Sequence, residues 1–255
     1  MKKTTLYFSL ATALTACLFL FPSLTGSIIL DANEKPKGFL SKLWAGNRTE
    51  FMTHSYPNNI RVVKIEGSSN PVNVDILEGE KKLFSPTPNS HKLRFSKDTL
   101  IIKTNNAAYL QLYASSNLTK IIFEHATGQL SIKDRKTPLK VELMQSSTIR
   151  LNFPSLTVDD STAVIRDLNL FVSEKSVATL VSGKAKSITA CVNNAELNYS
   201  NAVAVDSANV QLAGRSIVKS LAFGSEHKLN NLIVSGNKQY FKPELVGNNV
   251  QLQIK

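Results

Sequence analysis

The chain has few of the residues that cross-link a fold or mark its tight turns. Its 255 residues include two cysteines, Cys17 and Cys191, which excludes a disulfide framework. A free, buried thiol is therefore the expectation for Cys191. One tryptophan, Trp44, argues against a sugar groove built from stacked indole rings. Neither Asn-Gly nor Asp-Gly occurs, and residues 155–242 contain no proline, so the usual signals for two-residue hairpins are missing.

The rest of the composition is that of a folded chain with a basic excess. With 42% hydrophobic and 19% charged residues, it is neither wholly disordered nor a polytopic membrane protein. The net charge is +11, and residues 156–255, with 10 basic and 8 acidic side chains, contribute only +2 of it. Such basic clusters are usually solvated surface, and otherwise attract anionic glycans or lipid headgroups. The clustered side chains in the first half are Lys81, Lys82, His91, Lys92, Arg94, Lys97 and Lys103, followed by Lys133, Arg135, Lys136 and Lys140.

An uncharged segment, residues 4–30, follows the cationic start Met-Lys-Lys. This order is typical of an export signal or a membrane anchor. Residues 6–22 are longer than an ordinary signal-peptide core, and residues 4–30 together are long enough to span a bilayer as a helix. A cleaved signal and a retained anchor both remain open. The third alternative is lipidation at Cys17, which ends the lipobox-like run Leu-Thr-Ala-Cys.

All three alternatives place the body of the protein outside the cytoplasm. We therefore expect an exported protein of the periplasm or cell envelope, anchored through residues 4–30 if the leader is retained. An exported basic chain is not expected to meet nucleic acid, so its expected partner is an envelope protein or an anionic envelope glycan or lipid. Residues 1–30 are expected to be the leader, residues 31–50 a polar tether broken by proline and glycine, and residues 51–255 one domain.

Short strands with period-two hydrophobicity recur through residues 51–255. Most are triplets of apolar, polar and apolar residues, such as Leu168-Asn169-Leu170 and Val210-Gln211-Leu212, whose middle residue should face solvent. Small polar residues, which suit corners because they bond to the local backbone, precede several of them. They are Ser147, Ser161, Ser176, Asn194 and Ser207, at intervals of 14, 15, 18 and 13 residues.

Triplet strands with such corners predict an all-β fold of stacked rungs rather than long antiparallel hairpins. The expected fold is a right-handed parallel β-helix, or β-solenoid, preceded by an N-terminal signal or membrane-anchor helix. The less regular residues 51–103 are expected to cap its first rung, because open ends of such a stack invite pairing. A β-sandwich is the alternative.

Part of the chain resembles the head GIN domain family of bacterial cell-envelope proteins, often labelled autotransporter adhesins. The resemblance spans residues 51–234 and rests on four segments: Ile60–Gly67, Val72–Val74, Asp98–Ile102 and Asp206–Leu212. The resemblance implies a β-solenoid that presents an extended surface, and it brings no catalytic residue with it. Family members tend to have Ser-Gly-Ala-Ser at the rung corners, where this chain mostly lacks the glycine.

The densest acidic cluster is Asp159, Asp160 and Asp167. Paired carboxylates of this kind serve glycoside-cleaving enzymes, so a β-helix polysaccharide-degrading enzyme is one alternative function. Adjacent residues on a strand point to opposite faces, however, and aspartates are ordinary corner residues. We therefore predict no catalytic residue in this cluster.

No other motif indicates a reactive centre. The sequence has no Gly-x-Ser-x-Gly elbow and no phosphate-binding loop, and its histidines lack metal-ligand spacing. The prediction is thus no catalytic, cofactor-binding or metal site, no cofactor and no enzyme activity. The expected function is a non-catalytic β-solenoid surface for protein or envelope interaction and adhesion, with a polysaccharide- or anionic-lipid-binding module as the alternative. The four histidines are His54, His91, His125 and His227.

Overall fold

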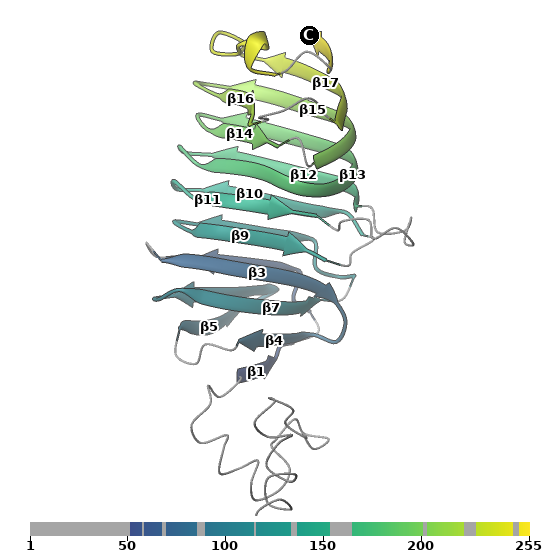
Figure 1. Ribbon diagram of the computed structural model, residues 1–255. Helices are drawn as coiled ribbons and strands as arrows, with labels where there is room; N and C mark the ends of the chain where they lie inside the picture. The colour runs from purple at the N-terminus through teal and green to yellow at the C-terminus, as the bar shows by residue number, and fades with distance from the viewer. Residues whose placement is uncertain are drawn as a thin grey trace, which may run out of the picture. The chain divides into compact units, whose positions relative to one another are not determined.

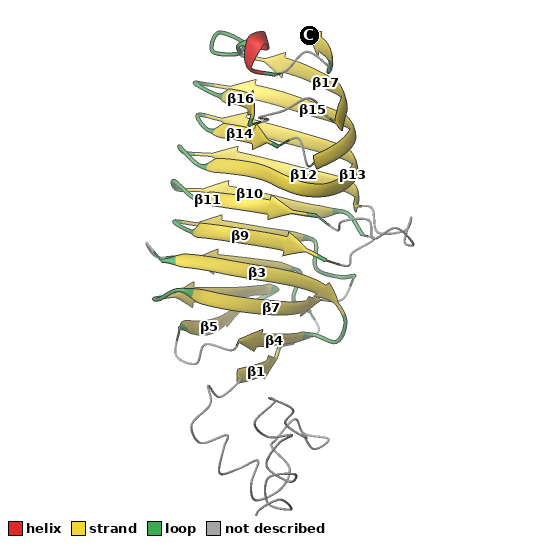
Figure 2. Cartoon of the chain, in the orientation of Figure 1, coloured by secondary structure: helices red, strands yellow, loops and turns green. Residues whose placement is uncertain are grey.

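In the computed structural model, strands alternate between two series of hydrogen-bonded strands, which we call ladder 1 and ladder 2 (Figures 1 and 2). The structure describes residues 52–57, 59–67, 70–85, 90–114, 116–133, 137–153, 165–200, 203–221, 228–246 and 250–255. Ladder 1 contains, in spatial order, β5 (His91–Ser96), β6 (Thr99–Thr104), β2 (Val62–Glu66), β8 (Lys120–Glu124), β10 (Leu139–Met144), β12 (Ile165–Ser173), the second part of β13 (Val177–Asn193), β15 (Val203–Ala213), β17 (Lys228–Gly236) and β18 (Gln251–Ile254). Ladder 2 contains β1 (Met52–Ser55), β4 (Lys82–Ser85), β7 (Ala108–Ala114), β3 (Pro71–Glu78), β9 (Thr127–Ile132), β11 (Thr148–Asn152), the first part of β13, β14 (Glu196–Tyr199) and β16 (Ile217–Ser220).

Most neighbouring strands in both ladders are parallel. Among the described residues, the antiparallel pairs are β1 with β4, β4 with β7, and β5 with β6, all at one end of the ladders (Figure 1). The protein is therefore all-β with a largely parallel sheet. The antiparallel β-sandwich considered as the alternative does not fit this pairing.

The strands follow the period-two pattern of the sequence. In β7, buried residues alternate with half-buried ones along its whole length, and all four buried residues are apolar. Equivalent inward residues then stack from strand to strand, as Val141, Leu170, Ala190, Val210 and Val234 do along ladder 1. Each is at most 3% exposed, so the core is a series of apolar rows between the ladders.

Near the N-terminal end of the described residues, the spatial order of the strands differs from their order in the sequence. Strand β2 pairs with both β6 and β8, and β3 pairs with both β7 and β9. The β2–β3 layer is thus enclosed between a layer that follows it in the sequence and the layer after that. The expected cap over residues 51–103 is correct for β1, β4 and β5, which add the antiparallel edge strands. It is wrong for β2 and β3, whose alternating apolar residues Val63, Ile65, Val72, Val74 and Ile76 are buried as in any inner layer.

Strand β13 belongs to both ladders, and Gly183 is where it passes from one to the other. Its first part pairs with β11 and β14, and its second part pairs with β12 and β15. Gly183 has φ +105°, and a Cβ at this position would lie 2.5 Å from the carbonyl oxygen of Phe153. Glycine therefore lets the chain turn between ladders without a loop.

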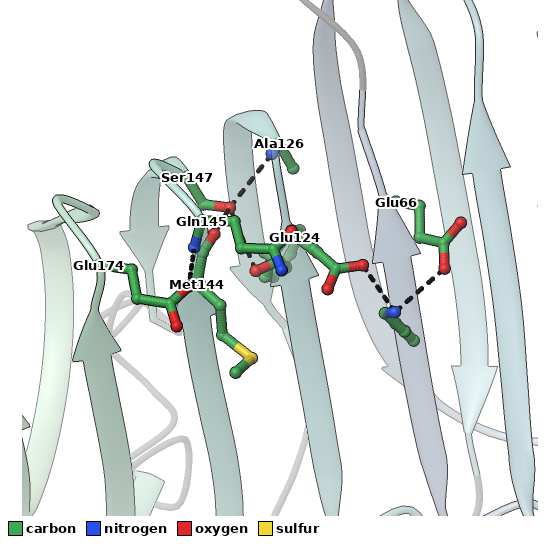
Figure 3. A network of polar contacts seen from close by, with 9 residues as sticks. Glu66, Glu124, Ala126, Met144, Gln145, Ser147 and Glu174 are labelled. Carbon is green, nitrogen blue, oxygen red and sulfur yellow. Dashed lines mark hydrogen bonds and ion pairs between the residues drawn. The ribbon is translucent and has the colours of Figure 1, made fainter.

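Buried serines occupy corners between the two ladders. The Ser147 hydroxyl donates to the carbonyl oxygens of Met144, at 2.7 Å, and Phe123, at 3.1 Å, and accepts the amide N–H of Ala126 at 3.1 Å (Figure 3). The amide N–H of Ser147 in turn donates to Ser176 Oγ on the next corner, 3.1 Å away. These hydroxyls satisfy corner backbone groups that no strand partner reaches.

Replacing Ser147 with alanine is expected to lower the free energy of unfolding by about 2 kcal/mol. The hydroxyl is fully buried, and its removal leaves the Ala126 amide N–H without an acceptor in a dry site. Urea denaturation followed by circular dichroism measures the loss. The exposed neighbour Ser146 is the control, since Ser146→Ala should change the free energy by less than about 0.5 kcal/mol. Equal losses in the two variants would contradict the role given to the Ser147 hydroxyl.

The corner prediction from the sequence holds in part. Ser147, Ser176 and Asn194 lie at corners, and Asn194, with φ +50°, accepts the Arg215 amide N–H on its Oδ1 at 3.0 Å. Ser207 instead lies within β15, opposite Ser187. Ser161 lies outside the described residues.

The predicted leader and tether, residues 1–30 and 31–50, also lie outside the described residues, as do Cys17 and Trp44. In the part of the chain that the structure describes, no helix has the length and apolar character needed to cross a membrane. The described helix is one short 3-10 turn, η1 (Pro243–Leu245). Next to it, the buried Tyr199 hydroxyl donates to the Val246 carbonyl oxygen at 2.5 Å, and burial raises the pKa of this hydroxyl.

Candidate functional site

The outward side chains of ladder 1 form straight rows, because its parallel strands pair in register. From β12 to β18 these side chains are mostly uncharged, and we call the surface they make the polar face. Neighbouring members of a row are one strand spacing apart, about 4.8 Å. The three rows are Asn169, Thr189, Asn209, Ile233 and Gln253; Phe171, Cys191, Gln211 and Ser235; and Asp167, Ser187, Ser207, Asn231 and Gln251.

The polar face is hollowed into an open groove of about 550 Å³. Amide and hydroxyl groups of Thr189, Asn209 and Gln211 line it, together with the apolar surface of Phe171 and Ile233. Amides and hydroxyls each donate and accept hydrogen bonds. Lys140 and Lys255 also line the groove, so uncharged hydrogen-bonding groups, apolar surface and two lysines face the same hollow.

On the other half of ladder 1, the charged side chains of β2, β8 and β10 are paired with one another. Lys64 Nζ lies 2.6 Å from Glu124 Oε2 and 3.1 Å from Glu66 Oε1, so one lysine joins strands β2 and β8 (Figure 3). The hydrogen bond to Glu124 is the main reason why the pKa of Lys64 is raised. These pairs tie β2 and β8 together and leave little free charge on these two strands.

A second ionic group marks the border between the charged half and the polar face. Glu142 Oε1 accepts hydrogen bonds from Lys140, at 2.7 Å, and Lys120, at 3.2 Å. Burial alone would raise the pKa of Glu142, but the two lysines outweigh burial and hold this pKa below its ordinary value. Lys140 also lies 5.9 Å from the ring centre of Phe171, at the start of the groove.

On ladder 2, three residues distant in sequence meet around a buried carboxylate. Asp75 is 5% exposed although it lies on the outward side of β3, and its Oδ2 lies 2.5 Å from both Lys133 Nζ and the Tyr109 hydroxyl. The hydrogen bond to Asp75 raises the pKa of Lys133, whereas burial first and Asp75 second raise that of Tyr109. Gln111 Nε2 also donates to the Tyr109 hydroxyl at 3.0 Å. The group joins β3, β7 and the end of β9, and its polar atoms bond one another.

Of the acidic cluster that the sequence offered as an enzymatic alternative, the described residues include Asp167. Asp159 and Asp160 lie outside the described residues. Asp167 is exposed at one edge of the polar face, where it accepts a hydrogen bond from Ser187 Oγ at 2.5 Å. The Asp167 carboxylate is thus already hydrogen-bonded to Ser187 on the neighbouring strand.

Two of the four histidines meet in space although they are 37 residues apart in sequence. His54 of β1 and His91 of β5 pack edge to face, with ring centres 6.1 Å apart. Burial, and secondarily the charge of His54, lower the pKa of His91, whose Nδ1 lies 3.2 Å from Ser90 Oγ. His125 is exposed at the corner after β8, and His227 lies outside the described residues. Among the described residues, no three metal-ligating side chains gather.

The expectation of a buried thiol at Cys191 is wrong. This free cysteine is half-buried and belongs to the groove, because it is the middle residue of the triplet Ala190-Cys191-Val192 and points outward. The period-two rule already predicts this direction, since Ala190 and Val192 fill the inward positions.

The basic side chains picked out in the sequence divide into two kinds. Lys82, Lys133 and Lys140 are in ion pairs with Glu80, Asp75 and Glu142. The side chains of Lys92, Arg94, Lys97 and Lys103 gather instead on the β5–β6 hairpin, and all four are exposed. Arg135 and Lys136 lie outside the described residues.

Comparisons with known proteins give a distant likeness. Neither a protein-family model nor a curated protein matches the chain. A solved structure from Clostridium sporogenes, described as a putative cell adhesion protein, is similar at 14% sequence identity. The match covers 81% of this chain and 98% of that one, with a TM-score of 0.25. This is weak structural similarity, and membership of the head GIN domain family stays a prediction.

Proposed function

We propose that this chain is an exported, non-catalytic protein of the bacterial cell envelope, and that its polar face binds a protein or glycan surface in adhesion. In this proposal the two ladders are the sides of a right-handed parallel β-solenoid. The observation on which the binding role depends is the polar face itself, three rows of mostly uncharged side chains in register over β12, β13, β15, β17 and β18.

Strand order supports the solenoid. From β8 to β16, each layer contributes one strand to ladder 1 and then one to ladder 2, and successive layers pair in parallel. Parallel crossovers are right-handed in nearly all proteins, which favours a right-handed coil. A circular-dichroism spectrum dominated by helix would contradict this fold.

The chemistry of the polar face supports a binding role. Asn169, Thr189 and Asn209 are exposed and lie on neighbouring strands, so a partner meets the same kind of group at each strand spacing. Repeated donors and acceptors suit an extended ligand with its own repeat, and the flanking Phe171 and Ile233 add apolar contact. The sequence expectation of a non-enzymatic protein is retained in this proposal.

Two added lysines on the polar face are expected to weaken binding to isolated cell-envelope material at least tenfold. Thr189→Lys with Asn209→Lys places adjacent like charges where an uncharged partner would bury them without counter-ions. The measurement is the concentration of full-length protein that half-saturates the envelope preparation.

The matched control is Thr127→Lys with Thr148→Lys, two exposed residues that pair in the same way on ladder 2. The control should bind as the unmodified chain does. Equal binding by both double variants would exclude the polar face as the adhesive surface. Turnover of an acidic polysaccharide that is lost in Asp159→Ala or Asp160→Ala would replace the proposal with the enzymatic alternative.

A further inference from the structure

The β5–β6 hairpin places two lysines directly against each other. Lys92 of β5 is the antiparallel partner of Lys103 of β6, and both side chains are exposed on the outward face. Like charges at opposite positions of an antiparallel pair destabilise the pair. Arg94, two residues along the same face of β5, adds a third positive charge. Lys97, in the turn that joins the two strands, adds a fourth.

Nearby carboxylates do not neutralise these charges. Glu66 is the register neighbour of Lys103, but it is in an ion pair with Lys64 at 3.1 Å. Asp98 in the turn accepts a hydrogen bond from Thr99 Oγ1 at 3.3 Å. Within the described part of the chain, Lys92, Arg94, Lys97 and Lys103 form no ion pair. The other lysines on this half of ladder 1, Lys64, Lys120 and Lys140, each have a carboxylate partner.

An exposed aromatic ring lies on the other face of the same strand. Phe95 is 46% exposed, a large value for phenylalanine, although it pairs with the buried Leu100 and so points to the face opposite Lys92 and Arg94. Among the described residues β5 pairs only with β6, so its other edge is free and side chains from both of its faces reach that edge. An approaching surface therefore meets the cations and the ring together.

We propose that the β5–β6 hairpin docks on an anionic lipid membrane, with Lys92, Arg94, Lys97 and Lys103 on the headgroup phosphates and Phe95 in the interfacial layer. Lipid phosphates relieve the repulsion between Lys92 and Lys103, and the interface takes up an aromatic ring that a soluble anionic glycan would leave in water. The proposal rests on the proposed export of the chain but not on the polar face, which lies at the other end of ladder 1.

The test uses the full chain with a single tryptophan at the hairpin, Trp44→Phe with Phe95→Trp. Vesicles of phosphatidylcholine alone are compared with vesicles that also contain phosphatidylglycerol. Anionic vesicles are expected to shift the Trp emission to shorter wavelength, and brominated lipids should quench it. In the same background, Lys92→Gln with Lys103→Gln should weaken partitioning into anionic vesicles about 30-fold at low ionic strength, because each lysine near such a surface contributes about 1 kcal/mol.

The control removes equal charge elsewhere, through Lys186→Gln with Lys242→Gln, both exposed and outside the hairpin. The apolar leader is common to all variants, so its own affinity for lipid cancels in the comparison. Loss of the opposed lysines relieves repulsion, so the variant is expected to melt no lower than its parent. Equal partitioning by the two double variants would overturn the proposal. Salt-sensitive binding to soluble polygalacturonate, without quenching by brominated lipid, would also overturn it in favour of a glycan.

Discussion

Replacing Phe123 with alanine is expected to lower the free energy of unfolding by about 3–5 kcal/mol. Phe123 is fully buried on β8, where its register neighbours are Ile65 on β2 and Leu143 on β10. It is the largest of the fully buried side chains in the described residues. Its removal leaves a cavity between three consecutive strands of ladder 1, and paired backbones on both sides limit how far the cavity can close.

Urea denaturation measured by circular dichroism gives the loss. The matched control is Ile122→Ala on the same strand, because Ile122 is only half-buried on the outward face. That variant should lose less than about 1.5 kcal/mol. A loss at Ile122 as large as that at Phe123 would mean that the outward face is covered and that the inward rows are not the main core.

Gly128→Ala is expected to lower the free energy of unfolding by about 3 kcal/mol or more. The cause is a clash with the backbone of the neighbouring strand and not the loss of a side-chain contact. Gly128 pairs with Val72 across β9 and β3 and has φ +151°. A Cβ there would lie 2.0 Å from the Val72 carbonyl oxygen and 2.7 Å from its carbonyl carbon and amide nitrogen. These atoms belong to the ladder, so relief requires β3 and β9 to separate, which adds to the strain of the φ value itself.

Amide hydrogen exchange measures which strands the Gly128→Ala substitution destabilises. Amides of β3 and β9 should lose protection in Gly128→Ala, together with a lower melting temperature. Gly79→Ala is the control, because its nearest neighbour is the Tyr113 ring edge at 3.2 Å, which can rotate, and it should cost less than about 1 kcal/mol. Unchanged protection of β3 in Gly128→Ala would show that the ladder tolerates the methyl group.

The direction in which side chains point was predictable for most strands. Leu168-Asn169-Leu170 and Val210-Gln211-Leu212 bury their outer members and expose their middle residues, as the alternation predicts. The same rule applies to Cys191, where the general preference of cysteine for burial led to the wrong expectation. Alternation needs only the local geometry of an extended chain.

Contacts between distant segments were not predictable. Tyr109 and Asp75 are 34 residues apart in sequence, and they meet because the β2–β3 layer lies between the layers of β6–β7 and β8–β9. The pairing of His54 with His91 likewise depends on the edge strands β1 and β5 coming to the same end. A sequence read in order predicts each strand beside the next one, which is the wrong order here.

The amino-acid sequence alone determined that the described part of residues 51–255 forms strands, which of their side chains face inward, and that the basic excess belongs to the first half. The strands are longer than the triplets, up to the 17 residues of β13. The local geometry of a single extended strand is sufficient to predict the strands and their inward side chains. Counting the charged residues along the sequence is sufficient to place the basic excess. The parallel pairing that the triplet pattern predicted is confirmed by the largely parallel sheet. Only the tertiary structure decided that β2 and β3 are enclosed and that Lys92 faces Lys103. Strand order and register are set by which apolar rows bury together over long sequence separations, and no local pattern contains that information.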